Sequence, residues 1–228
     1  MPKRYGFAAY RLSHPPPESA NWPLLTNQLT INYDAAMGRP REFDEDEVIA
    51  EALQTFWKQG YGATSIPDLM EATQLERGSI YKAFEDKHSL FERAFDNYLR
   101  AGRAKMAQIL GSDAPPIARL QAFFAQVVAG CSGAEGGPGC LAVNTMVELA
   151  PSDAAVRDRL VRHWKVVERM LEQTLRDGQS EGEIRKDVSA KDLARLVVKL
   201  IAGIAVFSRQ GSPTDATQTI IQLLSRVR

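Results

Sequence analysis

The sequence predicts an all-α fold, in which a three-helix N-terminal domain precedes a larger helical C-terminal domain. From Asp44 onward, apolar residues recur three or four positions apart, which is the spacing of one face of an α-helix. No segment shows a convincing apolar–polar alternation of the kind that marks a β-strand. Two of the expected helices are short and joined by a tight turn at Gln74 and Leu75, which is the arrangement of a helix-turn-helix.

Local signals mark the helices of the N-terminal domain. The first begins after Asp44 with an acidic first turn, which suits the positive end of the helix dipole, and it ends at Gly60. The second is short and begins at Ser65, whose hydroxyl can cap it with Asp68 as the capping-box partner. A third helix of eight or nine residues follows the turn, and a fourth starts near Lys87.

Every element after residue 100 also has the helical pattern. Two prolines open the first of these helices, and a glycine-rich break closes it. The expected ranges are 116–129, 140–149, 154–179, 190–204 and 214–227.

The composition is that of a globular protein without an overall attraction for nucleic acid or membranes. Hydrophobic residues make up 44% of the 228 positions, which is enough for a core. The formal net charge is zero, so any binding to DNA must be local. The longest apolar stretch, residues 196–207, is shorter than the roughly 18 residues needed to span a bilayer. The first ten residues contain no apolar run of the kind found in signal peptides, so we expect no export signal. We therefore expect a cytoplasmic protein that does not bind membranes.

Residues 1–36 differ from the rest of the chain. They contain the run His14-Pro15-Pro16-Pro17 and show neither the helical nor the strand period. We expect this segment to be an extension that is disordered or not always translated.

Two runs of residues carry a specific resemblance. They are GYGATSI at residues 60–66 and LERGSIYKAFEDK at residues 75–87. Both closely resemble the DNA-binding signature of the TetR/AcrR family of transcriptional repressors, and residues 39–95 follow the family pattern almost position by position. The resemblance implies a helix-turn-helix DNA-binding domain at residues 37–86 and a helical effector-binding and dimerisation domain at residues 87–228. It also implies a homodimer on a double-stranded DNA operator.

Most positions of the matched segment have a physical reason to meet DNA. Thr64, at the start of the second helix, can donate its hydroxyl to a phosphate. Gly78 lets the backbone of the third helix come close to DNA, and Arg77 can pair with a phosphate or a guanine edge. The resemblance adds phosphate contacts from Tyr81 and Lys87. The predicted DNA-binding residues are Arg39, Arg41, Thr64, Ser65, Arg77, Gly78, Ser79, Tyr81, Lys82 and Lys87.

The predicted DNA-binding region is nevertheless net acidic. Residues 37–100 contain eight Lys or Arg and thirteen Asp or Glu, and five of these acids lie in or beside the first helical turn. We therefore expect few phosphate contacts and a modest salt dependence of binding. Glu76 departs from the family pattern, and two roles stay open for it: an interaction with the N-terminus of the third helix, or acceptance of a hydrogen bond from a cytosine amine.

For the C-terminal domain the resemblance implies an effector pocket and a four-helix dimer interface. Asn144 and Glu148 are informative, because polar groups in an otherwise apolar short helix must be paired or hydrated. Ordinary core packing is the alternative for the apolar candidates. The last two helices are the expected dimer interface, where Ala202, Gly203 and Ala205 permit close approach. The predicted effector-binding residues are Phe123, Phe124, Val127, Asn144, Met146, Glu148, Trp164 and Met170.

The sequence therefore predicts a DNA-binding regulator that a small molecule of unidentified structure releases from a palindromic operator. The alternative is a redox-responsive regulator switched through Cys131 and Cys140, although the absence of a CxxC pair makes two free thiols the plainer interpretation. An enzyme is disfavoured, because the loop GAEGGPG lacks the Lys-Ser/Thr of a phosphate-binding loop and no Gly-x-Ser-x-Gly elbow occurs. We expect no cofactor and no metal, since His163 has no second histidine at helical spacing.

Overall fold

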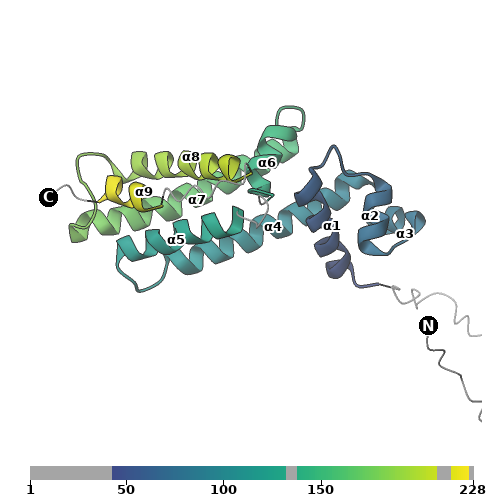
Figure 1. Ribbon diagram of the computed structural model, residues 1–228, viewed down its shortest axis with the longest axis horizontal. Coiled ribbons are helices and arrows are strands. Elements are labelled where there is room, and N and C mark those ends of the chain that lie inside the picture. Colours follow the sequence, from purple (N-terminus) through teal and green to yellow (C-terminus); the bar gives the residue numbers. More distant parts are fainter. Residues whose placement is uncertain (1–42, 132–137, 210–216, 226–228) are drawn as a thin grey trace, which may run out of the picture. The chain divides into compact units, whose positions relative to one another are not determined.

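A computed structural model describes residues 43–131, 138–209 and 217–225, and this part of the chain consists of α-helices without a β-sheet (Figure 1). The prediction of an all-α fold is confirmed. None of the described helices is long and apolar enough to cross a bilayer. The helices are α1 (Glu45–Gln59), α2 (Ile66–Thr73), α3 (Arg77–Phe84), α4 (Lys87–Leu110), α5 (Pro116–Cys131), α6 (Leu141–Glu148), α7 (Ala154–Glu181), α8 (Ala190–Ser208) and α9 (Thr217–Leu224).

The first helices begin and end at the signals in the sequence. The side chain of Asp44 caps α1, and α1 ends at Gly60, whose φ of 88° favours glycine. Ser65 and Asp68 form both hydrogen bonds of a capping box at the start of α2. Gln74 takes a left-handed conformation, with φ of 55°, in the turn to α3. These local bonds define the helix-turn-helix formed by α2 and α3, and we call α1, α2 and α3 the head.

Two hydrophobic cores hold the described helices together. The first lies between the head and the first half of α4, and Leu141 of α6 and Leu160 of α7 join it. The second lies among α4, α5, α7, α8 and α9. Helix α4 therefore belongs to both cores, and Figure 1 shows it running from the head into the C-terminal bundle. The domain boundary predicted between residues 86 and 87 falls at the first residue of this shared helix.

The C-terminal helices match their expected ranges to within a few residues. Helix α7 continues to Glu181 and ends at Gly182, whose φ is 80°. Helix α9 runs from Thr217 to Leu224, and the residues at 214–216 and 226–227 that were expected to extend it lie outside the described residues. The expected extension at residues 1–36 also lies outside them.

Candidate functional site

Helix α3 buries one face and exposes the other. Ile80 and Phe84 are 0% and 2% exposed and pack in the first core. Arg77, Tyr81 and Lys82 lie exposed on the other side. The Arg77 guanidinium lies 5.6 Å from the centre of the Tyr81 ring. The outer face of α3 therefore presents two cations and a phenol, which are groups that pair with phosphates and base edges.

Three neighbouring positions complete this face. A Cβ atom on Gly78 would meet no atom within 4 Å, so packing within the chain does not require glycine there. Ser79 is half-buried. Glu76 is the N-cap residue of α3, but its side chain makes no capping hydrogen bond. Arg39 and Arg41 lie outside the described residues.

Two of the predicted DNA-binding hydroxyls are engaged inside the chain. Thr64 is 1% exposed, and its hydroxyl donates a hydrogen bond to the carbonyl of Gly60 at 2.6 Å. The Ser65 hydroxyl donates to the Asp68 carboxylate at 2.6 Å. In the protein without DNA, the Thr64 hydroxyl therefore closes the turn before α2, and its expected contact with a phosphate stays a prediction.

The turn between α1 and α2 is held from two sides. The ammonium of Lys87, at the start of α4, donates to the carbonyls of Tyr61 and Thr64 at 3.0 and 2.8 Å. This ammonium also lies 4.3 Å from the centre of the Tyr61 ring. On the other side, the Glu148 carboxylate of α6 accepts hydrogen bonds from the backbone N–H groups of Tyr61 and Gly62 at 3.1 and 2.6 Å. We expected Lys87 to contact a DNA phosphate and Glu148 to contact the effector. In the structure, both side chains bond to the backbone of this turn.

The two glycines of the turn let the carboxylate approach. A Cβ atom at Gly62 would lie 3.0 Å from Oε1 of Glu148, and one at Gly60 would lie 3.2 Å from Oε2. Larger residues here would displace Glu148 and loosen the contact between α6 and the head.

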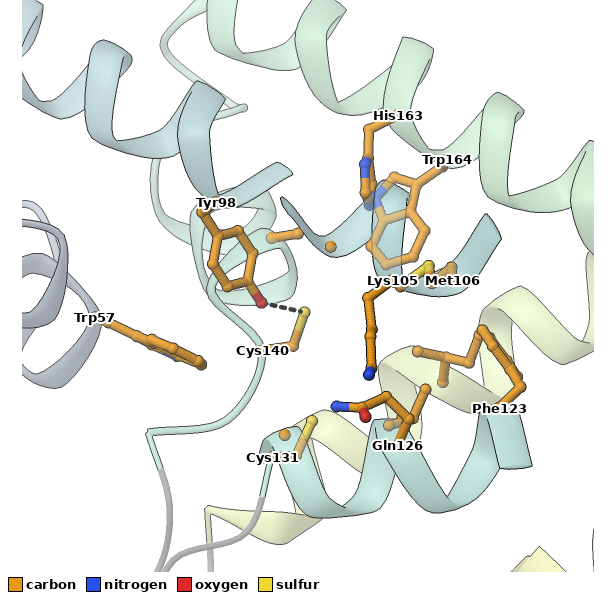
Figure 2. A pocket seen from close by; sticks show the side chains of 15 residues that line it. Trp57, Tyr98, Lys105, Met106, Phe123, Gln126, Cys131, Cys140, His163 and Trp164 are labelled. Carbon is orange, nitrogen blue, oxygen red and sulfur yellow. Dashed lines mark hydrogen bonds between the residues drawn. The ribbon is translucent and has the colours of Figure 1, made fainter. Parts of the chain in front are cut away.

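A cavity of about 200 Å³ lies among α4, α5, α7 and α8, next to the start of α6 and to Trp57 of α1 (Figure 2). We call this cavity the pocket. Three of the predicted effector-binding residues, Phe123, Val127 and Trp164, line it. The predicted residues that do not line it are Phe124, Asn144, Met146, Glu148 and Met170.

These other candidates have different surroundings. Phe124 is fully buried in the second core, and Met170 packs against the same core. The Asn144 amide donates to the carbonyl of Pro138 at 2.8 Å. Met146 is 37% exposed. Asn144 and Glu148 are paired, as expected, but with backbone atoms and not inside the pocket.

Several lining residues escaped the sequence analysis. Tyr98, Gly102 and Lys105 lie on one face of α4 at helical spacing, and that periodicity was the signal that could have found them. Trp57 reaches the pocket because α1 packs beside residues 138–140, which lie just before α6. Its indole N–H donates to the carbonyl of Gly139 at 2.9 Å.

The buried polar groups of the pocket are held in their neutral forms. Burial, followed by the nearby charge of Arg103, lowers the pKa of His163 to about 4. Burial, followed by the neighbouring Cys140, raises the pKa of the Cys131 thiol to about 12. The Tyr98 hydroxyl lies 3.5 Å from the sulfur of Cys140, and burial raises the pKa of this phenol well above its usual value. His163, Cys131 and Tyr98 are therefore uncharged at pH 7.

Helix α8 leaves an apolar stripe uncovered. Leu196, Val206 and Phe207 are 51%, 49% and 56% exposed, and a Cβ atom on Gly203 would meet nothing within 4 Å. Apolar side chains gathered in this way are typical of an interaction surface. Ala205 is 1% exposed and packs in the second core, so the expectation that it assists a contact between subunits is wrong.

Known proteins match both parts of this architecture. Residues 48–94 match the family model described as bacterial regulatory proteins of the tetR family, and residues 116–224 match the tetracyclin repressor-like C-terminal domain. The HTH-type transcriptional repressor ComR of Escherichia coli strain K12 is 31% identical over 185 residues, which cover 80% of this chain and 88% of ComR. The chain belongs to the TetR family. It is a DNA-binding transcriptional repressor of that family, whose members are regulatory and not enzymatic.

Solved TetR-family structures have the same fold. A cysteine-substituted form of the regulator CifR, complexed with 26-base-pair operator DNA, aligns with a TM-score of 0.70 at 26% identity over 82% of this chain and 100% of that one. A TetR regulator from Chloroflexus aurantiacus J-10-FL also aligns with a TM-score of 0.70, at 27% identity, over 81% of this chain and 96% of the other. These matches include the head and the C-terminal helices together.

Proposed function

We propose that this TetR-family repressor binds a palindromic operator as a homodimer through the outer face of α3, and that a small molecule in the pocket releases it. The exposure of Arg77, Tyr81 and Lys82, on a helix whose inner side is anchored in the first core, carries the proposal. A helix presented in this way fits a major groove about 12 Å wide. The likeness to CifR, which is bound to operator DNA in its solved structure, supports this use of the head.

The homodimer is supported by the apolar stripe on α8. A two-fold symmetric pair presents two heads, so its operator contains two half-sites. Sedimentation of the full chain is expected to give a dimer at micromolar concentration, and a monomer would contradict this part of the proposal.

Helix α6 is suited to connect the pocket with the head. Its N-cap residue, Cys140, lines the pocket, and its last residue, Glu148, accepts hydrogen bonds from the turn between α1 and α2. The bond from Trp57 to Gly139 ties α1 to the segment just before α6. We propose that an effector displaces the start of α6 and thereby shifts the heads away from the spacing of the operator. The size of this shift is limited by the difference in effector affinity between the two states.

The DNA-binding role is tested by substitutions on α3. The double variant Tyr81→Ala/Lys82→Ala is expected to lose operator affinity by about 100-fold or more, because each dimer loses four side chains from its contact surface. The operator is first selected from random duplexes with the unaltered protein, and affinity is then measured by fluorescence anisotropy. Lys58→Ala, which removes the same charge from an exposed position of α1, is the matched control and is expected to change affinity by less than about threefold. Retained affinity in the double variant, with fold and dimer intact, would refute the assignment.

A redox-responsive repressor is the second candidate. It is favoured by one observation: the two free thiols, Cys131 and Cys140, line the same pocket. It is opposed by the raised pKa of Cys131, since the thiolate is the reactive form. Titration of free thiols before and after mild peroxide decides between the candidates. A count that stays at two, with unchanged operator affinity, would exclude the redox switch.

A further inference from the structure

The pocket contains one cationic side chain and no acidic one among the described residues that line it. Figure 2 shows Lys105 extending from α4 toward Gln126 of α5. Lys105 is exposed, and its ammonium has no hydrogen bond or ion pair with any described residue. Gln126 is also exposed and has no hydrogen-bond partner in the described part of the chain. The open side of the pocket therefore offers a positive charge and an amide that are free to meet a ligand.

A buried side chain of the pocket provides a further N–H group. The Arg103 guanidinium lies 3.5 Å from Nδ1 of His163. A guanidinium can only donate, so Nδ1 is the acceptor and the proton of the neutral ring is on Nε2. The imidazole therefore adds no charge, and Lys105 is the one charged side chain among the described residues that line the pocket.

The walls of the pocket are mainly aromatic. Trp57, Tyr98, Phe123 and Trp164 come from four different helices and surround the cavity in Figure 2. A concave, mostly apolar cavity with a few polar groups is typical of a small-molecule site. Aromatic rings pack favourably edge-to-face or offset against one another. The cavity of about 200 Å³ suits a ligand with a single substituted ring more than a fused polycyclic one.

The charge of the ligand follows from Lys105. A cationic ligand would be repelled by this ammonium and would find no carboxylate among the described residues of the lining. A monoanion matches the single ammonium of the described lining, whereas a dianionic phosphate would have one negative charge without a cationic partner there. We propose that the pocket binds a small aromatic monocarboxylate, whose anionic group pairs with Lys105 and whose ring lies among the aromatic walls. This inference rests on the proposed role of the pocket as the effector site.

Matched ligands test the proposal in the full-length protein by isothermal titration calorimetry. The probes are benzoate, phenylacetate and 4-tert-butylbenzoate, each compared with its neutral amide and with the corresponding benzylic or phenethyl ammonium. At least one acid is expected to bind about tenfold more tightly than its amide, because the ion pair is a charge-assisted hydrogen bond. The ammonium probes are expected to bind more weakly than the amides. The inference is overturned if no acid in the series exceeds its amide.

Substitutions of Lys105 identify the group responsible. Lys105→Met keeps an apolar stem about as long as that of lysine and removes the ammonium. It is expected to abolish the preference for the acid while changing the affinity of the amide by less than about threefold. Lys105→Arg is expected to retain the preference. Lys165→Met, at an exposed position of α7 that does not line the pocket, is the control and should behave like the unaltered protein. A preference for the acid that survives in Lys105→Met would overturn the proposal.

Operator binding in the presence of the same probes separates the two proposals. If an acid binds through Lys105 but leaves operator affinity unchanged, the ligand class is upheld and the effector role of the pocket fails. If only a neutral or cationic compound binds in the pocket and releases the operator, the effector role is upheld and the ligand class fails.

Discussion

The outer face of α3 and the pocket are built in different ways. The exposed residues of α3 come from one helix of eight residues, so the helical period alone decides which of them face outward. The pocket is lined from α1, α4, α5, α6, α7 and α8, together with Cys140 just before α6. Its composition therefore depends on how separate helices pack. A contact surface on a single helix is accessible to sequence analysis, whereas a cavity among several helices depends on distances that no local pattern contains.

The largest of the expected changes in stability comes from the protonation of His163, which lines the pocket. Its folded pKa of about 4 lies below the ordinary value of 6.5, so the unfolded chain binds the proton more tightly. The stabilisation from this group is present above pH 6.5 and is lost as the pH falls toward 4. Between pH 7.5 and pH 4.5 the protein is expected to lose about 2–3 kcal/mol through His163 alone.

Urea unfolding of the unaltered protein and of His163→Gln at both pH values measures this loss. Glutamine does not ionise, so the variant is expected to lose correspondingly less stability on acidification. The comparison at pH 7.5, where both side chains are neutral, is the internal control. Equal losses in the two proteins would show that His163 is not held in its neutral form by the fold.

An intermediate effect is expected where the head meets α6. Glu148→Gln replaces the charged acceptor of the Tyr61 and Gly62 amides by a neutral one, which weakens these bonds by about 1–2 kcal/mol. Hydrogen exchange of the two amides is expected to accelerate about tenfold. Glu172→Gln, which breaks an ion pair with Arg176 within α7, is the matched control and should leave the turn unchanged. Unchanged exchange in Glu148→Gln would remove the structural basis for coupling through α6.

The smallest expected effects are those of substituting two serines of the head, one of which is expected to change stability and the other operator affinity. Ser65→Ala removes the capping box of α2 and is expected to cost about 1 kcal/mol of stability, with little change in operator affinity well below the melting temperature. Ser79→Ala, on α3, is expected to do the reverse, lowering operator affinity with little change in stability. Thermal unfolding and anisotropy on both variants measure the two quantities. A large loss of operator affinity in Ser65→Ala, without such a loss in Ser79→Ala, would show that the Ser65 hydroxyl contacts DNA.

The helical period predicts which residues of a helix are exposed, but it does not predict which atoms their side chains bond. Exposure on α3 was predictable for Arg77 and Tyr81, because the buried Ile80 and Phe84 set the phase of the helix. The hydrogen-bond acceptor of the Thr64 hydroxyl, in contrast, could not be predicted from the sequence. A threonine before a helix has a phosphate, a solvent molecule or a nearby carbonyl as possible partners, and only the backbone path brings the Gly60 carbonyl within 2.6 Å.

The sequence by itself determined the all-α fold, most helix ends, the helix-turn-helix and the family, because each of these depends on residues close together in the chain. The tertiary structure alone decided that Glu148 and Lys87 hold the same turn, and that Trp57 and Lys105 line one pocket. The physical reason is the range of the interactions. Capping bonds and helical periodicity act over three or four residues, whereas Trp57 and Gly139 are 82 positions apart and meet only after the cores have formed.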